Sequence, residues 1–250
     1  MLKVSIITIT YNSEATLADT LKSVLNQTYK NIEYIIIDGK STDSTLSIID
    51  AYKSSIAKVV SEKDNGLYDA LNKGIAVATG DVIGILHSDD FYTSNTVIEK
   101  IVQTLSENES DAVYADLYYV DKNNTDNIFR KWKSGSYKHG MFLSGWMPPH
   151  PTFFAKRTCY QSFGSFNLNL VSAADYELML RFIHKHKIKL AYLPEFIIKM
   201  RVGGKSNVSL KNRIRANNED RKAWKINGLK PHFYTLYAKP LRKIIQLFKK

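Results

Sequence analysis

Residues 81–90 have the sequence DVIGILHSDD, an apolar run that ends in four polar residues. Two earlier stretches show the same arrangement: residues 3–12 are KVSIITITYN, and residues 33–39 are EYIIIDG. Apolar runs of this length between helix-like stretches are typical of strands in a largely parallel sheet. Ligands of such open sheets bind outside the carboxyl ends of the strands, so the polar endings predict a ligand site along one sheet edge.

Helix-like stretches separate the apolar runs. Residues 14–25 place leucines and a valine on one helical face, and residues 41–44 (STDS) supply cap residues for a helix that carries Leu46 and Ile49. This alternation predicts an α/β fold with an open, mostly parallel sheet flanked by helices. The other expected elements are strands at residues 3–10, 33–38, 57–60 and 81–86 and helices at residues 67–78 and 93–105.

The later part of the chain lacks this regular alternation. The elements expected there are an aromatic strand at 112–120, a hairpin turn at 123–124, a helix at 173–186 and a last strand at 189–193. We predict one α/β domain over residues 1–200 and a basic helical tail over residues 201–250.

The positive charge of the chain is concentrated in that tail. The 250 residues carry a formal net charge of +11, and residues 201–250 contain 14 Lys and Arg against 2 Asp and Glu. A nearly neutral body with a basic tail predicts an anionic surface as a partner. No apolar run is long enough to span a membrane, the first twelve residues are typical of a strand, and Cys159 is the single cysteine. A cytoplasmic protein is therefore expected.

Three polar clusters follow the predicted strands: Thr10-Tyr11-Asn12, Asp38-Gly39 and Ser88-Asp89-Asp90. Taken alone, Asp38-Gly39 is typical of a tight turn, and adjacent acids belong more often to a capping loop than to a metal site. Turn chemistry is a poor explanation for three clusters on one sheet edge. A carboxylate pair after a strand suits Mg²⁺ or Mn²⁺, which bind one or two protein carboxylates together with phosphate oxygens.

Two common nucleotide-binding motifs are missing from the sequence. No G-x-x-x-x-G-K-[ST] motif occurs, which excludes a P-loop. Residues 10–14 (TYNSE) stand where a dinucleotide-binding fold would carry G-x-G-x-x-G. The kind of nucleotide site that remains is one in which carboxylates and a metal ion hold the nucleotide.

The ordered set of motifs resembles the nucleotide-sugar domain of glycosyltransferase family 2. The similarity is strong over residues 3–92, which include SIITITYNSEATLADTLKSVLNQTYKNIEYIIIDGKSTDST and EKDNGLYDALNKGIAVATGDVIGILHSDD, and looser over residues 145–206. The resemblance implies a GT-A fold and an inverting sugar transfer, with a donor half at about 1–110 and an acceptor half at about 111–200. Residues 66–75 (GLYDALNKGI) are most similar to the subgroup that builds bacterial surface polysaccharides.

The resemblance also implies roles for individual residues at the nucleotide. Thr8 or Thr10, together with Tyr11, is expected to line a uracil pocket. Asp38 is expected to accept a hydrogen bond from the base, because an imide N–H is a donor that a buried carboxylate can satisfy. The residues expected to contact the nucleotide and the donor sugar are Asp64, Gly66, Asp69 and Asn72.

The metal ligand and the catalytic base follow from the same resemblance. Ser88-Asp89-Asp90 matches the D-x-D motif of the family, with Ser88 in place of the first acid. Asp90 is then the expected ligand of Mn²⁺ or Mg²⁺, and Asp89 is the expected ribose-side residue. Asp175 stands at the position of the catalytic base. Ala174 replaces the first acid of the usual pair, so the supporting charge is absent.

His150 and Arg201 are expected at the edge of the site. His150 lies in the stiff sequence PPHP at residues 148–151, and family members often carry a histidine there. A role near the acceptor or the diphosphate competes with a purely structural role. Arg201 precedes GGKS at residues 203–206, which is interpreted either as a loop that closes on the diphosphate or as an ordinary surface loop.

The function expected from these observations is metal-dependent transfer of a hexose from a UDP-sugar to a lipid-diphosphate-linked sugar, in O-antigen, capsule or exopolysaccharide synthesis. Two other functions compete with this one. A sugar-phosphate nucleotidyltransferase would need a glycine-rich basic loop after the first strand, and residues 11–14 lack one. A nucleic-acid-binding protein would use the basic tail, but no nucleic-acid motif occurs and no such partner is expected. A homo-oligomer remains open.

The end of the tail is expected to dock on the inner face of the cytoplasmic membrane. Residues 232–250 (HFYTLYAKPLRKIIQLFKK) place apolar groups on one helical stripe with basic residues between them. Pro240 restricts the amphipathic unit to residues 240–250. Each basic residue near an anionic leaflet is worth on the order of 1 kcal/mol. The alternative is that this stripe packs on the body of the protein or on another chain.

Overall fold

The structure, a computed structural model, describes residues 1–203 and 210–239. Within these residues nine strands form one sheet in the order β3-β2-β1-β4-β8-β6-β9-β5, and β7 pairs with β6. The strands are β1 (Val4–Thr10), β2 (Ile32–Asp38), β3 (Lys58–Ser61), β4 (Val82–Ile85), β5 (Asp90–Tyr92), β6 (Ala112–Val120), β7 (Ile128–Trp132), β8 (Phe154–Lys156) and β9 (Leu190–Arg201).

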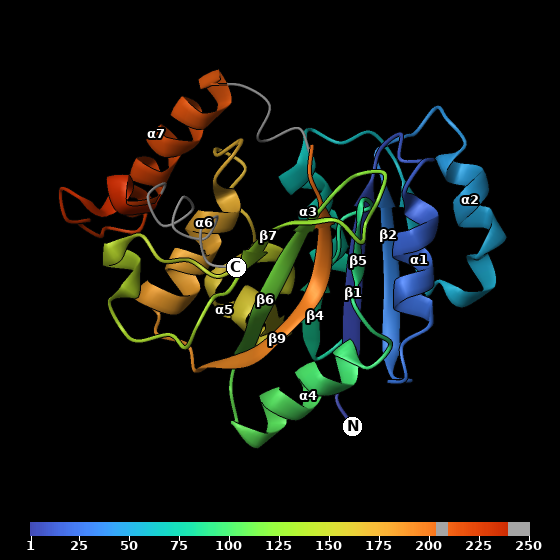
Figure 1. Cartoon of the computed structure of the whole chain (residues 1–250), viewed down its shortest axis with the longest axis horizontal. Coiled ribbons are helices and arrows are strands. Elements are labelled where there is room, and N and C mark those ends of the chain that lie inside the picture. The colour runs from blue at the N-terminus through green and yellow to red at the C-terminus, as the bar shows by residue number, and fades with distance from the viewer. Residues whose placement is uncertain (204–209, 240–250) are drawn as a thin grey trace.

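Helices cover both faces of the sheet (Figure 1). The helices are α1 (Leu17–Leu25), α2 (Thr45–Ala51), α3 (Leu67–Val77), α4 (Val97–Glu107), α5 (Arg157–Phe163), α6 (Ala174–Met179) and α7 (Leu210–Ile226). Short 3-10 turns occur at η1 (Lys53–Ser55), η2 (Met141–Ser144) and η3 (His150–Thr152), and a π-helix, η4 (Leu180–Lys185), continues α6. One core lies between the sheet and α1, α2 and α4, and the second lies between the sheet and α3, α5, α6 and α7.

Strand β1 shows why the early apolar runs are continuous. Its even-numbered residues Val4 and Ile6 pack in the core that contains α1 and α4. Ile7 and Ile9 point to the opposite face and pack in the core that contains α3. Because successive side chains of a strand alternate between faces, a strand buried on both sides needs apolar residues at nearly every position.

The predicted α/β class and the open sheet flanked by helices are confirmed. Parallel pairing joins β3, β2, β1 and β4, and it also joins β6 to β9. Strands β5, β7 and β8 are antiparallel to their neighbours, so the later half of the sheet is mixed. The hairpin expected around residues 123–124 connects β6 to β7.

Strand β9 extends beyond its predicted end at residue 193 and runs to Arg201. Pro194, which has no amide hydrogen, lies at an irregularity in the β6–β9 ladder: Tyr114 pairs with Tyr192, and Asp116 pairs with Phe196. A bulge of this kind accommodates proline within a strand. The continuation brings Arg201 beside the loop that precedes β5, where Asp90 pairs with Met200.

The first helix begins at Leu17, later than the predicted residue 14, and the helix predicted at 173–186 is divided into α6 and η4. At the other end, Trp224 and Leu236 are buried in the same core as α6. Figure 1 shows α7 at the upper left beside α6. No helix in the described ranges is long and apolar enough to cross a membrane. Residues 240–250, the predicted amphipathic unit, lie outside the described residues.

Candidate active site

The carboxyl ends of the parallel strands meet at one edge of the sheet. Thr10 at the end of β1 pairs with Asp38 at the end of β2, and Asp38 pairs with Ser61 of β3. The amide of Leu86, just after β4, donates to the carbonyl of Ile7. The polar clusters that follow β1, β2 and β4 therefore lie next to one another, as the strand order requires.

Asp38 is fully buried at this edge, and its carboxylate is bonded to neighbouring loops. It accepts hydrogen bonds from the amide and the hydroxyl of Ser41 and from the hydroxyl of Ser61, at 2.6 Å. Thr8 is buried below the edge, with its hydroxyl 3.1 Å from that of Tyr34. Thr10 lies at the strand end, and its hydroxyl has no partner within the described part of the chain. Of the two threonines, Thr10 is the one whose hydroxyl has no hydrogen-bond partner among the described residues.

Beside Thr10 lies a wall formed by Tyr11, Gly39 and Asp64. A Cβ atom at Gly39 would lie 2.9 Å from Asp64 Oδ2 and 3.3 Å from Tyr11 Cδ2, so a larger residue would force the side chain of Asp64 to shift. Tyr11 is 54% exposed. Lys73 Nζ contacts Asp64 at 2.8 Å and also pairs with Glu62, and these hydrogen bonds raise the pKa of Lys73. An exposed ring beside a charged pair suits a flat, polar group such as a nucleobase.

The residues from Gly66 to Asn72 shape the start of α3. Gly66 precedes the helix with a φ of +117°, a conformation that favours glycine. Asp69 accepts a hydrogen bond from the amide of Asn65 at 2.9 Å, which braces this turn. Asn72 donates to the carbonyl of Phe166 and accepts from its amide, both at 2.9 Å. The side chain of Asn72 therefore joins α3 to the loop that leads to α6.

The loop at residues 87–90 is held from two sides. The hydroxyl of Ser88 lies 2.9 Å from that of Ser13, and the hydroxyl of Thr16 donates to the carbonyl of Ser88. Thr20, one helical turn further along α1, donates to the carbonyl of Asp90 at 2.7 Å. Sequence reasoning did not single out Thr16 and Thr20, although their i, i+4 spacing on one helix face was visible.

Arg201 fixes the same loop from β9. It is 6% exposed, it donates from Nη1 to the carbonyl of Asp89 at 2.8 Å, and it pairs through Nη2 with Asp19. Its guanidinium carbon lies 4.8 Å from the centre of the Phe91 ring. Arg201 is thus part of the rigid wall of the site. Residues 204–206 of the GGKS sequence lie outside the described residues.

Asp90 is buried and lacks ordinary hydrogen-bond partners among the described residues, as is expected of a carboxylate that binds a cation. It is 1% exposed, and neither carboxylate oxygen makes a hydrogen bond of ordinary geometry with any described residue. Burial and the neighbouring charge of Asp89 raise its pKa well above the usual value, and Arg201 opposes this effect. A buried carboxylate without a partner is costly, and a divalent cation would remove that cost.

The donor set fits Mn²⁺ or Mg²⁺ when a phosphate supplies the other ligands. No group of three or more His, Cys, Asp or Glu side chains capable of holding a metal occurs within the described ranges. Mg²⁺ is commonly held by one or two carboxylates plus the phosphate oxygens of a substrate, so a single buried Asp90 fits such a shared site.

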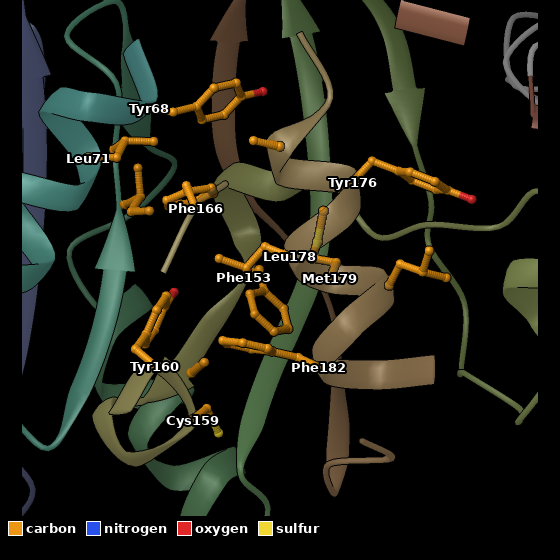
Figure 2. Packing of buried hydrophobic residues seen from close by; sticks show 14 of the residues in the cluster. Tyr68, Leu71, Phe153, Cys159, Tyr160, Phe166, Tyr176, Leu178, Met179 and Phe182 are labelled. Carbon is orange, nitrogen blue, oxygen red and sulfur yellow. The ribbon is translucent and has the colours of Figure 1, made fainter. Parts of the chain in front are cut away.

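Asp175 lies half-buried in the first turn of α6, and its charge acts on the rings of His87 and His150. The hydroxyl of Tyr68 donates to its Oδ1 at 3.1 Å. Burial and the charge of Asp175 raise the pKa of Tyr68, so the phenol stays protonated and remains a donor. Figure 2 shows the Phe166 ring below Tyr68, and the two rings stack with 5.4 Å between their centres. Tyr68 therefore holds the carboxylate in place.

Two histidines, His87 and His150, lie close enough to Asp175 for its charge to act on their rings. The rings of His87 and His150 are 6.0 Å apart, and His150 meets the Phe166 ring edge-on at 5.6 Å. Burial lowers the pKa of His150 to about 4, against the opposing charge of Asp175, and it also lowers the pKa of His87. Both rings are therefore neutral at pH 7, and each has one N–H to donate. Sequence reasoning named His150 but not His87, although His87 directly precedes Ser88-Asp89-Asp90.

Solved structures identify the fold. TarS residues 1–349 of S. aureus, in complex with UDP-GlcNAc, superposes with a TM-score of 0.71 at 18% identity, covering 90% of this chain and 65% of that one. The mannosyltransferase PcManGT of Pyrobaculum calidifontis, in complex with GDP-Man and Mn²⁺, has a TM-score of 0.68 at 17% identity, covering 97% and 73%. The fold is that of the GT-A glycosyltransferases.

The sequence comparisons identify the family. The model of "Glycosyl transferase family 2" matches residues 5–164, and the chain belongs to that family. An uncharacterized glycosyltransferase of Mycobacterium tuberculosis is 33% identical over 180 residues, covering 71% of this chain and 68% of the relative. A PGL/p-HBAD biosynthesis glycosyltransferase of Mycobacterium bovis is 30% identical over 181 residues, with the same two coverages. The resemblance found in the sequence is confirmed.

Proposed function

We propose that this glycosyltransferase moves a hexose from a UDP-sugar, with inversion, to a sugar carried on a lipid diphosphate, in the synthesis of a bacterial surface polysaccharide. The main observation in support of this proposal is the presence of Asp175 and Asp90 in one site. Asp175 is a half-buried carboxylate held by Tyr68, and Asp90 is a buried carboxylate without a described hydrogen-bond partner. Burial raises the pKa of Tyr119, and the charges of both carboxylates add to this rise, so the two groups lie in one region of the molecule. One base and one cation site are sufficient for a single displacement.

The proton of the acceptor hydroxyl goes to Asp175. Tyr68 occupies Oδ1 of the carboxylate, so we assign the other oxygen to the attacking hydroxyl. The hydroxyl oxygen bonds to the anomeric carbon while the bond from that carbon to the diphosphate breaks on the opposite face. The diphosphate leaves with the bonding electrons, and the neutral rings of His87 and His150 are positioned to donate N–H groups to its oxygens. A divalent cation held by Asp90 would neutralise the charge that develops there.

The base of the nucleotide is assigned to the wall formed by Thr10, Tyr11, Gly39 and Asp64, with Asp38 fixing the loop behind it. TarS with UDP-GlcNAc and PcManGT with GDP-Man support a nucleotide-sugar donor in general. We also assign Gly66, Asp69, Asn72, Ser88 and Asp89 to contacts with the nucleotide or the donor sugar. Asp69 shares Lys73 with Asp64, and Ser88 lies 2.9 Å from Ser13, whose hydroxyl donates to the carbonyl of Tyr11.

The proposal for the acceptor rests on the surface around Asp175 and on the C-terminal segment. Leu168 and Val171, in the loop before α6, are both exposed, which suits an acceptor with an apolar part. Further along, Ile226, Phe233 and Tyr237 are exposed close in sequence to the exposed Lys225 and Lys230. Exposed aromatic residues with lysines suit peripheral binding to an anionic membrane, where a lipid-linked acceptor resides.

Turnover of a panel of UDP-sugars with a lipid-diphosphate sugar acceptor tests the reaction, with thermal shifts for UDP, GDP and single-stranded RNA, each with Mn²⁺, as the binding test. We expect stabilisation by UDP and release of UDP only when donor and acceptor are both present. Asp175→Asn is expected to keep UDP binding and to lower kcat by roughly 10²–10⁴-fold, the usual range for losing a general base. Stabilisation by RNA and not by UDP would contradict the proposal.

A further inference from the structure

The turn that leads into α6 is held by a side chain from α7. Glu219, 5% exposed, accepts hydrogen bonds from the amides of Ser172 and Ala173 at 2.6 and 3.0 Å. Both bonds end on the same oxygen, Oε2. Arg215, one helical turn earlier on α7, donates from Nε to the hydroxyl of Ser172 at 3.1 Å. Two residues of one helix thus hold the turn before Asp175, Glu219 through the backbone of the turn and Arg215 through the side chain of Ser172.

These hydrogen bonds take the place of a local helix cap, which the sequence does not provide. Ala173 is the residue before α6, and no side chain of its own turn bonds the first amides. Ala174 cannot do so either, because it has no polar group. The first amides of a helix have no partner within the helix, and an acceptor that satisfies amides at its start fixes the turn. Glu219, from a distant part of the chain, accepts from the amide of the cap residue Ala173 and from that of Ser172 before it, and so fixes the turn that enters α6.

The residues that follow Asp175 are held by the same C-terminal segment. Trp224 Nε1 donates to the hydroxyl of Tyr176 at 2.9 Å, and Asn227 donates to Glu177 at 2.9 Å. Figure 2 shows Tyr176 directed away from Tyr68 and Phe166. Asp175 therefore reaches Tyr68 on one side of α6, while its neighbours are fixed from the other side.

We infer that Glu219 is a positioning residue for Asp175, and this inference rests on the proposed role of Asp175 as the base. Glu219 acts through the Ser172–Ala173 backbone, which sets the direction in which the first turn of α6 presents the carboxylate. What is required of Glu219 is an oxygen at the right place, since one oxygen makes both bonds. Its negative charge is not required.

Two substitutions separate position from charge. Glu219→Gln keeps an oxygen at the end of a side chain of the same length and removes the charge. Glu219→Asp keeps the charge and withdraws the oxygen by about 1.5 Å, the length of one carbon–carbon bond. We expect the Gln variant to keep kcat within about threefold and the Asp variant to lose roughly tenfold or more, because small misplacements of a catalytic group can cost up to about 10²-fold.

The control is Thr235→Val, because the Thr235 hydroxyl ties the same C-terminal segment to the carbonyl of Leu143 and not to the turn before α6. It is expected to lower the melting temperature without lowering kcat. For Glu219→Asp, the KM for the donor and the affinity for UDP should stay within about twofold of wild type, since only the base is displaced.

Four outcomes would overturn the inference. If Glu219→Asp lowers the melting temperature as Thr235→Val does and leaves kcat unchanged, Glu219 has only a structural role. If the Gln variant is inactive and the Asp variant is active, charge and not position is what matters. If Asp175→Asn keeps full turnover, the proposed base itself is wrong, whereas an inactive Asp175→Asn beside a fully active Glu219→Asp contradicts the inference alone.

Discussion

Asp90 is a buried acid whose carboxylate makes no ordinary hydrogen bond with the described residues, so its removal should cost the fold little. We expect Asp90→Ala to keep or raise the melting temperature of the protein without metal, because an unpaired buried carboxylate is unfavourable. Turnover should fall by roughly 10²–10³-fold or more, the range for losing a group that stabilises developing charge.

The measurement is the melting temperature with UDP, with and without Mn²⁺, for Asp90→Ala and for wild type. Only wild type should gain stability from Mn²⁺ in the presence of UDP. Undiminished turnover of wild-type enzyme treated with EDTA would contradict a cation at Asp90.

His150 predicts a loss of stability in mild acid. Burial lowers its pKa from 6.5 to about 4, so between these pH values the unfolded chain binds a proton that the folded chain does not. The free energy of unfolding should therefore fall as the pH drops from about 6.5 to 4, by at most about 1.4 kcal/mol per pH unit for this one proton. His87 acts in the same direction, while Asp90, with its raised pKa, acts in the opposite one.

Urea unfolding of wild type and His150→Asn between pH 4 and 7.5 isolates the contribution of His150. The difference in free energy of unfolding between the two proteins should be constant above pH 7 and should shift in favour of the variant as the pH falls. A difference that is independent of pH would show that His150 is not held in the neutral form.

The sequence predicted that Thr10, Asp38 and Asp90 lie near one edge because the carboxyl ends of parallel strands coincide, and the strand order agrees with this placement. It could not show that Asp38 is occupied by Ser41 and Ser61, since those bonds depend on how the loops fold back. It could not identify Glu219 either, because nothing local connects it with Asp175. His87 was missed because a single histidine beside a strand has no spacing that distinguishes it.

At the scale of single elements, α1 supports the loop of residues 87–90 through its threonines. Thr20 is fully buried, and its hydroxyl donates to the carbonyl of Asp90. We expect Thr20→Val to lower the free energy of unfolding by about 1–3 kcal/mol, because it leaves a buried acceptor without this donor. UDP affinity in the presence of Mn²⁺ should also fall, since the loop carries Asp90.

The matched control is Thr104→Val on α4, where the hydroxyl donates to the carbonyl of Lys100 within the same helix. It should change the free energy of unfolding little and UDP affinity not at all. Urea unfolding and calorimetric titration with UDP measure both quantities. Equal effects of the two substitutions on UDP affinity would remove α1 from the support of the site.

Helices and strands with a clear pattern of apolar residues could be predicted from the sequence, whereas short or interrupted ones could not. Strands β1, β2 and β4 followed from their continuous apolar runs. Strands β5 and β8 have three residues each, too few for any period, and α5 was likewise not anticipated. The end of β9 was set too early because Pro194 is normally a strand breaker, and here a bulge accommodates it. The helix at 173–186 was expected to be uniform, since a change from α to π geometry leaves the helical pattern of apolar residues almost unaltered.

At the scale of the whole molecule, the exposed aromatic residues of the C-terminal segment predict membrane binding. Phe233 is 89% exposed, so Phe233→Glu should leave the fold intact. It should weaken binding to anionic vesicles roughly tenfold or more, since it removes an apolar side chain worth about 1.5–3 kcal/mol on burial and adds a charge of the wrong sign. Flotation with anionic vesicles at low salt measures this.

Phe129→Glu on β7 is the control, because Phe129 is also exposed but belongs to a different surface. Its flotation should equal that of wild type. Equal flotation of Phe233→Glu and wild type would place any membrane contact elsewhere, and loss of flotation in both variants would point to a nonspecific effect of added acid.

The contact between Asn72 and the loop before α6 bears on how this enzyme could diversify. Both hydrogen bonds of Asn72 go to the main chain of Phe166, which every residue type other than proline presents in the same way. The two hydrogen bonds are therefore independent of the side chain at residue 166, whereas the stacking of the Phe166 ring on Tyr68 is not. Exchange of this loop, by engineering or in evolution, would keep the joint to α3 as long as Asn72 stays and residue 166 is an aromatic residue.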